Sequence, residues 1–134
     1  MPDKLLARFG FPKLVVRDLD REIEFYRAVM GYGEGQFITG QIAGRPIREI
    51  MWFGDSNNVE MLILEYVDGK GPPPEPSGVI SGIFTPDLDA FQARVLAAGG
   101  TVFQPIGPIE LPSGTSRFGF YADPEGYLME VIEG

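Results

Sequence analysis

An internal repeat constrains the fold of this chain more than any other feature. Asp18-Leu19-Asp20 opens a stretch that ends at Gly31, and Asp87-Leu88-Asp89 opens a second stretch, 69 positions later, that ends at Gly100. A repeat of this length indicates two similar supersecondary units, neither of which can bury its apolar face alone. We therefore expect one globule made of two modules, with a pocket at the interface between them.

The length and composition of the chain exclude several classes of protein. Its 134 residues suffice for one compact core, so we predict a single domain over residues 1–134. We expect no export signal and no membrane span, because no apolar run approaches the length of about eighteen residues that a span needs. The absence of cysteine excludes disulfides and a cysteine nucleophile and fits a cytoplasmic protein. The net charge of −8 argues against nucleic acid as a partner.

Apolar periodicity and turn residues divide the first repeat into one strand, one helix and three further strands. We predict the helix at residues 18–31 and the strands at 11–16, 36–42, 48–53 and 59–67. Asp18 or Asp20 can cap the start of the helix, and Gly31 can end it. The acidic run from Asp18 to Glu24 is predicted to form the solvated face of this helix. The first module then covers about residues 8–67.

The second repeat follows the same order after a linker at about residues 68–78, where prolines between glycines favour extended geometry. The predicted elements are a strand at 78–85, a helix at 88–98 and strands at 101–106, 116–121 and 127–132. Between the last two strands, Asp123-Pro124-Glu125-Gly126 has the residue order of a type I turn and predicts a hairpin. The second module covers about residues 79–134.

The offset between the two repeats changes once along the chain. It is 69 for the helices and 68 near the hairpin, where Asp55 aligns with Asp123 and Glu65 aligns with Glu133. A deletion of one residue between the strands of one module explains this difference. At the offset of 68, Leu62 is the counterpart of Glu130.

Several motifs, spread over nearly the whole chain, point to one known family. They are Val16-Arg17-Asp18-Leu19-Asp20, Phe25-Tyr26, Gly31-Tyr32, Asp87-Leu88-Asp89, Gly99-Gly100, and Asp123-Pro124-Glu125-Gly126 followed by Leu128-Met129-Glu130. Together they resemble the vicinal oxygen chelate superfamily, the glyoxalase, bleomycin-resistance and extradiol-dioxygenase group. The resemblance implies an α+β fold of two tandem βαβββ modules whose curved sheets form a cleft, and a homodimer. It does not specify an activity.

The same resemblance implies where metal ligands would stand. Members of the superfamily place them on the first and last strands of each module, and the matching positions here are Phe11, Leu62, Ile80 and Glu130. Three of these side chains are hydrocarbon and the chain has no histidine, so we predict neither a metal nor another cofactor. The alternative is a weakly held cation at Glu130 and Glu60, because Glu60 shares strand parity with Leu62.

We predict that the cleft between the modules binds a small apolar or aromatic molecule through Phe11, Trp52, Leu62, Ile80 and Glu130. Burial in such a cleft would raise the pKa of Glu130, which could then act as an acid, a base or a hydrogen-bond anchor. A structural pairing of Glu130 with an arginine such as Arg48 is the alternative.

Three functions follow from these residues. The favoured one is a metal-free binding protein that sequesters its ligand, and the second is a metal-independent isomerase, epimerase or lyase that uses Glu130 as acid or base. A metal-dependent glyoxalase or dioxygenase is the third, and the hydrocarbon side chains at the ligand positions argue against it.

Overall fold

The computed structural model describes residues 6, 11–42, 44–55, 58–72, 79–111 and 113–134, and its two sheets and two helices confirm the predicted α+β fold. The first module contains β1 (Lys13–Val15), α1 (Leu19–Met30), β2 (Gln36–Ile42), β3 (Arg45–Phe53) and β4 (Val59–Tyr66). The second contains β5 (Ser81–Thr85), α2 (Leu88–Ala97), β6 (Thr101–Leu111), β7 (Gly114–Ala122) and β8 (Leu128–Glu133). Neither of these helices is long and apolar enough to cross a membrane.

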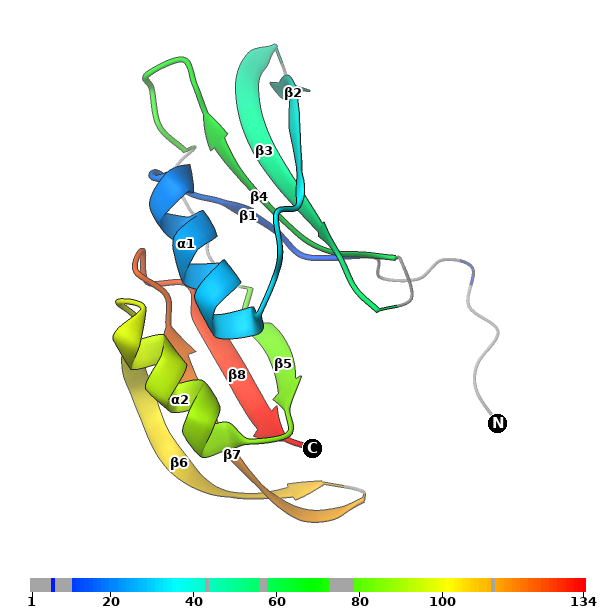
Figure 1. Cartoon of the computed structure of the whole chain (residues 1–134), viewed down its shortest axis with the longest axis vertical. Coiled ribbons are helices and arrows are strands. Elements are labelled where there is room, and N and C mark those ends of the chain that lie inside the picture. Colours follow the sequence, from blue (N-terminus) through cyan, green and yellow to red (C-terminus); the bar gives the residue numbers. More distant parts are fainter. Residues whose placement is uncertain (1–5, 7–10, 43, 56–57, 73–78, 112) are drawn as a thin grey trace.

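The two sheets have the same topology, with strand orders β1-β4-β3-β2 and β5-β8-β7-β6. In each sheet the first strand pairs in parallel with the last, and the other pairs are antiparallel. The helices α1 and α2 contact each other and lie on the same side of the molecule, as Figure 1 shows. Each sheet therefore has one face turned toward the helices and one face turned away from them.

Local chemistry fixes the helix ends near the predicted positions. The Asp18 carboxylate accepts the Arg21 N–H at 3.1 Å, and the Asp87 carboxylate accepts the Ala90 N–H at 3.0 Å. Gly31 ends α1 in the left-handed region, with φ of 77°. These caps explain why the pattern of the sequence located both helices to within a residue or two.

A single apolar cluster fills the space between the helices and the sheets of both modules. Its members are Leu14, Val16, Leu19, Ile23, Phe25, Tyr26, Val29, Ile50, Trp52, Met61, Ile63, Leu88, Phe91, Val95, Tyr121, Met129 and Val131. Gly100 belongs to this contact, because a Cβ atom there would lie 2.8 Å from Cε1 of Phe25 in the other module. A larger residue at this position would clash with Phe25 and also with Val95 and Ala122 of its own module.

An ionic arrangement at the start of each helix is repeated in the two modules. Arg48 contacts Asp20 and Glu65 at 3.0 Å each, and a carboxylate oxygen of Glu65 accepts the N–H of Leu19 at 3.1 Å. In the second module, Arg117 contacts Asp89 and Glu133, and Glu133 accepts the N–H of Leu88 at 2.9 Å. The last strand of each module thus holds the first turn of its own helix.

One strand extends beyond its predicted end. The sequence predicts a strand over 101–106, whereas β6 continues to Leu111 through Pro105 and Pro108. β6 lies at the edge of its sheet and its register shifts twice, at Val102/Gln104 and at Gln104/Gly107. An edge strand with bulges tolerates proline because the missing N–H is not needed for pairing.

The strand register confirms the predicted equivalence of Leu62 and Glu130. Leu62 lies opposite Met51 of β3, and Glu130 lies opposite Phe120 of β7. The same register shows that the predicted equivalence of Asp55 and Asp123 is wrong by one position.

The two hairpin connections identify the correct partner. The N–H of Gly54 donates to the carbonyl of Asn58, and the N–H of Asp123 donates to the carbonyl of Tyr127, both at 2.9 Å. Gly54 is therefore the counterpart of Asp123 at the offset of 69. The connections have equal length, so the residue by which the modules differ lies within a strand.

The additional residue of the first module is Glu60, in a β-bulge on β4. Trp52 lies opposite Met61, but the next residue of β3, Phe53, lies opposite Val59. Glu60 has no partner on β3, and the counterpart strand β8 pairs with β7 without such a shift. This bulge accounts for the change of the offset between the repeats from 69 to 68.

Candidate functional site

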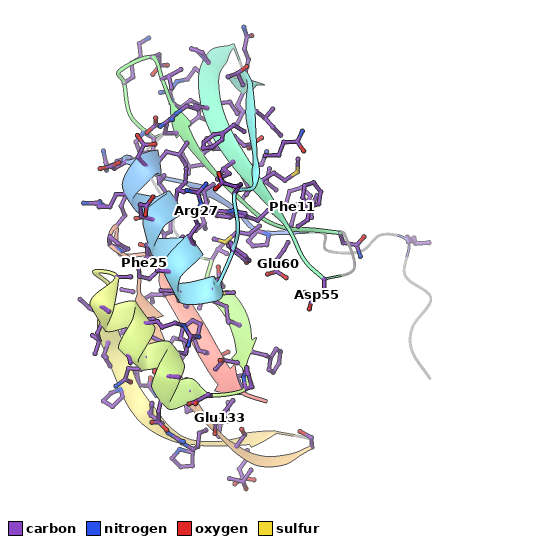
Figure 2. All side chains as sticks on the ribbon, viewed as in Figure 1. Phe11, Phe25, Arg27, Asp55, Glu60 and Glu133 are labelled. Atoms are coloured by element: carbon purple, nitrogen blue, oxygen red, sulfur yellow. The ribbon has the colours of Figure 1, made fainter. Side chains whose placement is uncertain are left out.

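A cavity of about 380 Å³ lies at the boundary between the modules. The first module contributes Pro12, Met30, Tyr32, Glu60 and Met61, and β5 contributes Ser81, Gly82, Ile83 and Phe84. Most of these side chains are apolar, and the volume falls within the range of about 300–1,000 Å³ typical of small-molecule sites. In Figure 2, Glu60 lies at the end of the first sheet that faces the second module.

The bulge on β4 directs the Glu60 carboxylate toward Tyr32. The Tyr32 hydroxyl donates to Oε2 of Glu60 at 2.7 Å, and the Tyr32 ring stacks on Trp52 with ring centroids 4.7 Å apart. Trp52 belongs to the helix-facing core and donates its indole N–H to the carbonyl of Gly33. The prediction that Glu60 shares a face with Leu62 is therefore wrong, because strand alternation is interrupted at the bulge.

The Glu60 carboxylate is held by the Tyr32 hydroxyl and accommodated by Gly54. Burial and the hydrogen bond to Glu60 raise the pKa of the Tyr32 hydroxyl well above its ordinary value, so the hydroxyl remains a donor at all physiological pH values. Gly54 leaves room for Oε1 of Glu60, because a Cβ atom at Gly54 would approach that oxygen to 3.0 Å. Within the described part of the chain, no lysine or arginine forms an ion pair with Glu60.

The five predicted contact residues do not surround this cavity. Phe11 and Ile80 are 41% and 51% exposed and precede the lining residues Pro12 and Ser81. Leu62 and Trp52 are both buried, but they lie on opposite faces of the first sheet. Leu62 shares a face with its strand partner Met51, whereas Trp52, the next residue along β3, points to the other face and packs against the helices. Glu130 is the remaining member of the set.

Glu130 lies half-buried on the face of the second sheet that is turned away from α2. It is opposite Gly82 on one side and Phe120 on the other, and the Phe118 and Phe120 rings are 5.8 Å apart. The alternative pairing of Glu130 with Arg48 is wrong, because the guanidinium of Arg48 binds Asp20 and Glu65. Glu130 is not among the residues that line the cavity, although its strand partner Gly82 is.

The sequence interpretation did not identify Tyr32 or the lining residues of β5. Tyr32 stands in a glycine-rich loop that has no regular periodicity, so no face could be assigned to it. The signal that could have located the site is the change of offset from 69 to 68, since it marks the module that carries an additional residue. Among the described residues, no group of three or more His, Cys, Asp and Glu side chains is placed to hold a metal ion.

A second polar cluster joins α1 to the turn between β7 and β8. The Glu125 carboxylate accepts the N–H of Arg17 at 2.8 Å and the N–H of Asp18 at 2.8 Å, and its side chain is only 8% exposed. Tyr127 donates its hydroxyl to the carbonyl of Val15. The turn predicted from the sequence therefore also fastens the second module to the first.

Glu22 is buried in this cluster, so the prediction that residues 18–24 form a solvated face is wrong at this position. No donor among the described residues reaches its carboxyl oxygens, and Asp123 beside it accepts the Tyr26 hydroxyl at 2.9 Å. Burial, followed by the hydrogen bond to Asp123 and the charges of Asp123 and Glu125, raises the pKa of Glu22 to about 9, although Arg21 acts in the opposite direction. Glu22 therefore holds its proton at neutral pH.

Two βαβββ modules with a cavity at their boundary define a protein of the paired βαβββ class. A family model described as the Glyoxalase/Bleomycin resistance protein/Dioxygenase superfamily matches residues 7–131, and the chain belongs to this superfamily. A probable lactoylglutathione lyase of Vibrio cholerae is 32% identical over 123 residues, which cover 90% of this chain and 86% of that protein.

Solved structures share the fold. Glyoxalase I from Zea mays matches with a TM-score of 0.70 and 22% identity, over 93% of this chain and 44% of that one. A glyoxalase/bleomycin resistance protein from Albidiferax ferrireducens matches with a TM-score of 0.65 and 21% identity, over 94% of this chain and 98% of that one.

Proposed function

We propose that this protein binds a small, largely apolar or aromatic molecule in the cavity between its modules, without a metal ion. The observation that carries the proposal is the cavity itself, which has apolar walls from both modules and a single carboxylate, that of Glu60. Binding at a boundary between two rigid units is typical of such sites. We further propose that the protein acts in the cytoplasm.

The residues at the four ligand positions of the superfamily do not fit a catalytic metal. Phe11, Leu62 and Ile80 offer no donor atom, and Glu130 is the one carboxylate. Lys13 is the strand partner of Leu62, and its ammonium group contacts Glu49 at 3.1 Å, so the residue beside this ligand position carries a positive charge that disfavours a cation. For this reason we do not transfer the activity of the relatives named lactoylglutathione lyase to this chain.

The purified protein should contain no stoichiometric transition metal and should show no lactoylglutathione lyase activity when Zn²⁺ or Ni²⁺ is supplied. Elemental analysis after dialysis and an activity assay with each ion measure this. Recovery of one tightly held metal ion per chain would contradict the proposal and would show that the donor set has been misassigned.

Small neutral aromatic molecules should raise the melting temperature, and a Gly82→Leu variant should weaken this effect. Benzyl alcohol and phenol are suitable probes, and titration calorimetry of the wild type gives their affinity. A Cβ atom at Gly82 would meet no other atom within 4 Å, so the variant should fold normally while its side chain takes up space at the wall of the cavity. Equal affinities of both proteins for both probes would place the ligand elsewhere.

Acid or base catalysis by Glu130 is the second candidate function. The position of Glu130 between Gly82 and Phe120, on a half-buried face with aromatic rings, favours it. A Glu130→Gln variant separates the two candidates, because it should abolish an isomerase, epimerase or lyase reaction but should leave binding in the Glu60 cavity unchanged.

We also propose a homodimer. Within the described residues, β1 and β5 each pair on one side only, and Phe84 on β5 is 71% exposed. An unpaired edge with an exposed aromatic side chain favours association with a second copy. Light scattering should give about twice the chain mass of 14.7 kDa, and a Phe84→Lys variant should shift the mass toward that of one chain.

A further inference from the structure

We propose that the cavity selects an organic cation with an apolar body, and that Glu60 pairs with the cationic group. This inference rests on the proposed function, since it assigns a chemical class to the molecule bound in the same cavity. It depends on the charge of Glu60, on the way Tyr32 holds it, and on the apolar surface around it.

Glu60 offers a ligand one carboxylate oxygen. Tyr32 occupies Oε2 with its hydroxyl at 2.7 Å, and Oε1 lies near Gly54, with no donor to it in the described part of the chain. The stacking of Tyr32 on Trp52 fixes the position of the hydroxyl, and the hydroxyl in turn fixes the carboxylate. A ligand therefore meets a positioned acceptor rather than a freely rotating side chain.

A cation suits this acceptor better than a neutral or an anionic group. A neutral ligand that covers Glu60 removes water from a charged carboxylate without supplying a counter-charge, which costs free energy. An anionic ligand is repelled both by Glu60 and by the net charge of −8. An ammonium or amidinium group replaces the lost water with a charge-assisted hydrogen bond.

The remaining walls suit an apolar body. Met30, Met61 and Ile83 line the cavity together with Pro12. Methionine side chains adapt to differently shaped apolar surfaces and make favourable contacts with aromatic rings. The charge of Glu60 and these walls together describe an amphiphilic cation.

The second module has no counterpart of this carboxylate. β8 pairs with β7 without a bulge, so the residue inserted at Glu60 in the first module is absent from the second. The cationic subsite is consequently a property of one module.

Benzamidine, benzamide and benzoate provide a matched series of a cation, a neutral molecule and an anion around one ring. Calorimetric titration of the wild-type protein should give a dissociation constant for benzamidine about tenfold lower than for benzamide, and weaker binding of benzoate than of either. Glu60→Gln should remove the difference between benzamidine and benzamide, because its amide oxygen still accepts from Tyr32 but carries no charge. Glu110→Gln, a control at an exposed hairpin of the second module, should preserve it.

The methyl resonances of Met30 and Met61 report where the probe binds. Benzamidine should shift both in the wild type and in Glu110→Gln. Equal affinity of the wild type for benzamidine and benzamide, or a preference that persists in Glu60→Gln, would overturn the cationic assignment while leaving the proposed binding function intact. If neither benzamide nor benzamidine bound or shifted these methyl groups, the proposed function would fail as well. The wild-type comparison decides the matter even if Glu60→Gln does not fold.

Discussion

The free energy of unfolding should fall as the pH rises from about 5 to about 9, and a Glu22→Gln variant should lose most of this dependence. The pKa of Glu22 is about 9 in the folded protein and has its ordinary value of 4.5 in an exposed carboxyl. Between these values the folded chain holds a proton that the unfolded chain releases, so each rise in pH favours unfolding. The stabilising contribution is complete below the unfolded pKa and is lost as the pH approaches the folded one.

Urea unfolding at pH 5, 7 and 9 measures this effect. The Gln variant should be more stable than the wild type by about 2–4 kcal/mol at pH 9, because an amide occupies the buried position without a charge. At pH 5 the two proteins should differ little, since both carry a neutral side chain. Glu24→Gln on the same helix is the control, because the Glu24 side chain is 80% exposed. Parallel pH profiles for wild type and Glu22→Gln would show that Glu22 does not carry the proton.

Replacement of Glu125 by alanine should lower the free energy of unfolding by about 2–3 kcal/mol. This is the cost of removing a charged acceptor and leaving its N–H donors without a partner. The carboxylate accepts the N–H groups of Arg17 and Asp18, which precede α1 in the other module. Arg21 lies 3.7 Å from the same carboxylate and adds a weaker attraction. Thermal and urea unfolding measure the loss.

Hydrogen exchange distinguishes this role from a general loss of packing. In Glu125→Ala the amides of Arg17 and Asp18 should exchange faster, whereas the amide of Ala90, which Asp87 caps in the second module, should keep its protection. Glu110→Ala is the control for stability, because Glu110 accepts only from Thr115 at an exposed hairpin among the described contacts. Unchanged exchange at Arg17 and Asp18 would refute the assignment of Glu125 as the clasp between modules.

The sequence located the elements of this fold because their signals are local. Asp18 and Asp87 cap the helices through their own following residues, and the turn that begins at Asp123 closes with the hydrogen bond from the Gly126 N–H to its carbonyl. These interactions span a few residues and depend on side-chain type, so a pattern of residues suffices to predict them. The equivalence of Leu62 and Glu130 followed from the same regularity.

The candidate site was predicted less well because it depends on an irregularity. Strand alternation placed Glu60 beside Leu62, and it fails at the bulge, which redirects every residue on one side of it. The change of offset indicates that one module has an additional residue, but residue types alone do not distinguish an insertion near Gly54 from one at Glu60. The pairing partner of Phe53 decides this, and pairing is a long-range property.

Burial of a charged residue was equally inaccessible to the pattern. Glu22 stands among Asp20, Arg21 and Glu24, a composition typical of a solvent-exposed helix face. Its burial arises because the turn of the second module, with Asp123 and Glu125, packs over that face. Only the arrangement of the modules reveals it.

The hydrogen bonds at the start of α1 also set an order for folding during synthesis. The bond from Leu19 to Glu65 joins residues 46 positions apart, whereas the bond from Arg17 to Glu125 joins residues 108 positions apart. A growing chain can therefore anchor α1 within the first module while most of the second is still untranslated, and chains generally fold from the N-terminal unit onward. The N–H groups of Arg17 and Asp18 gain their acceptor only after Glu125 has been synthesised. We therefore expect the nascent first module to serve as the template on which the second module docks.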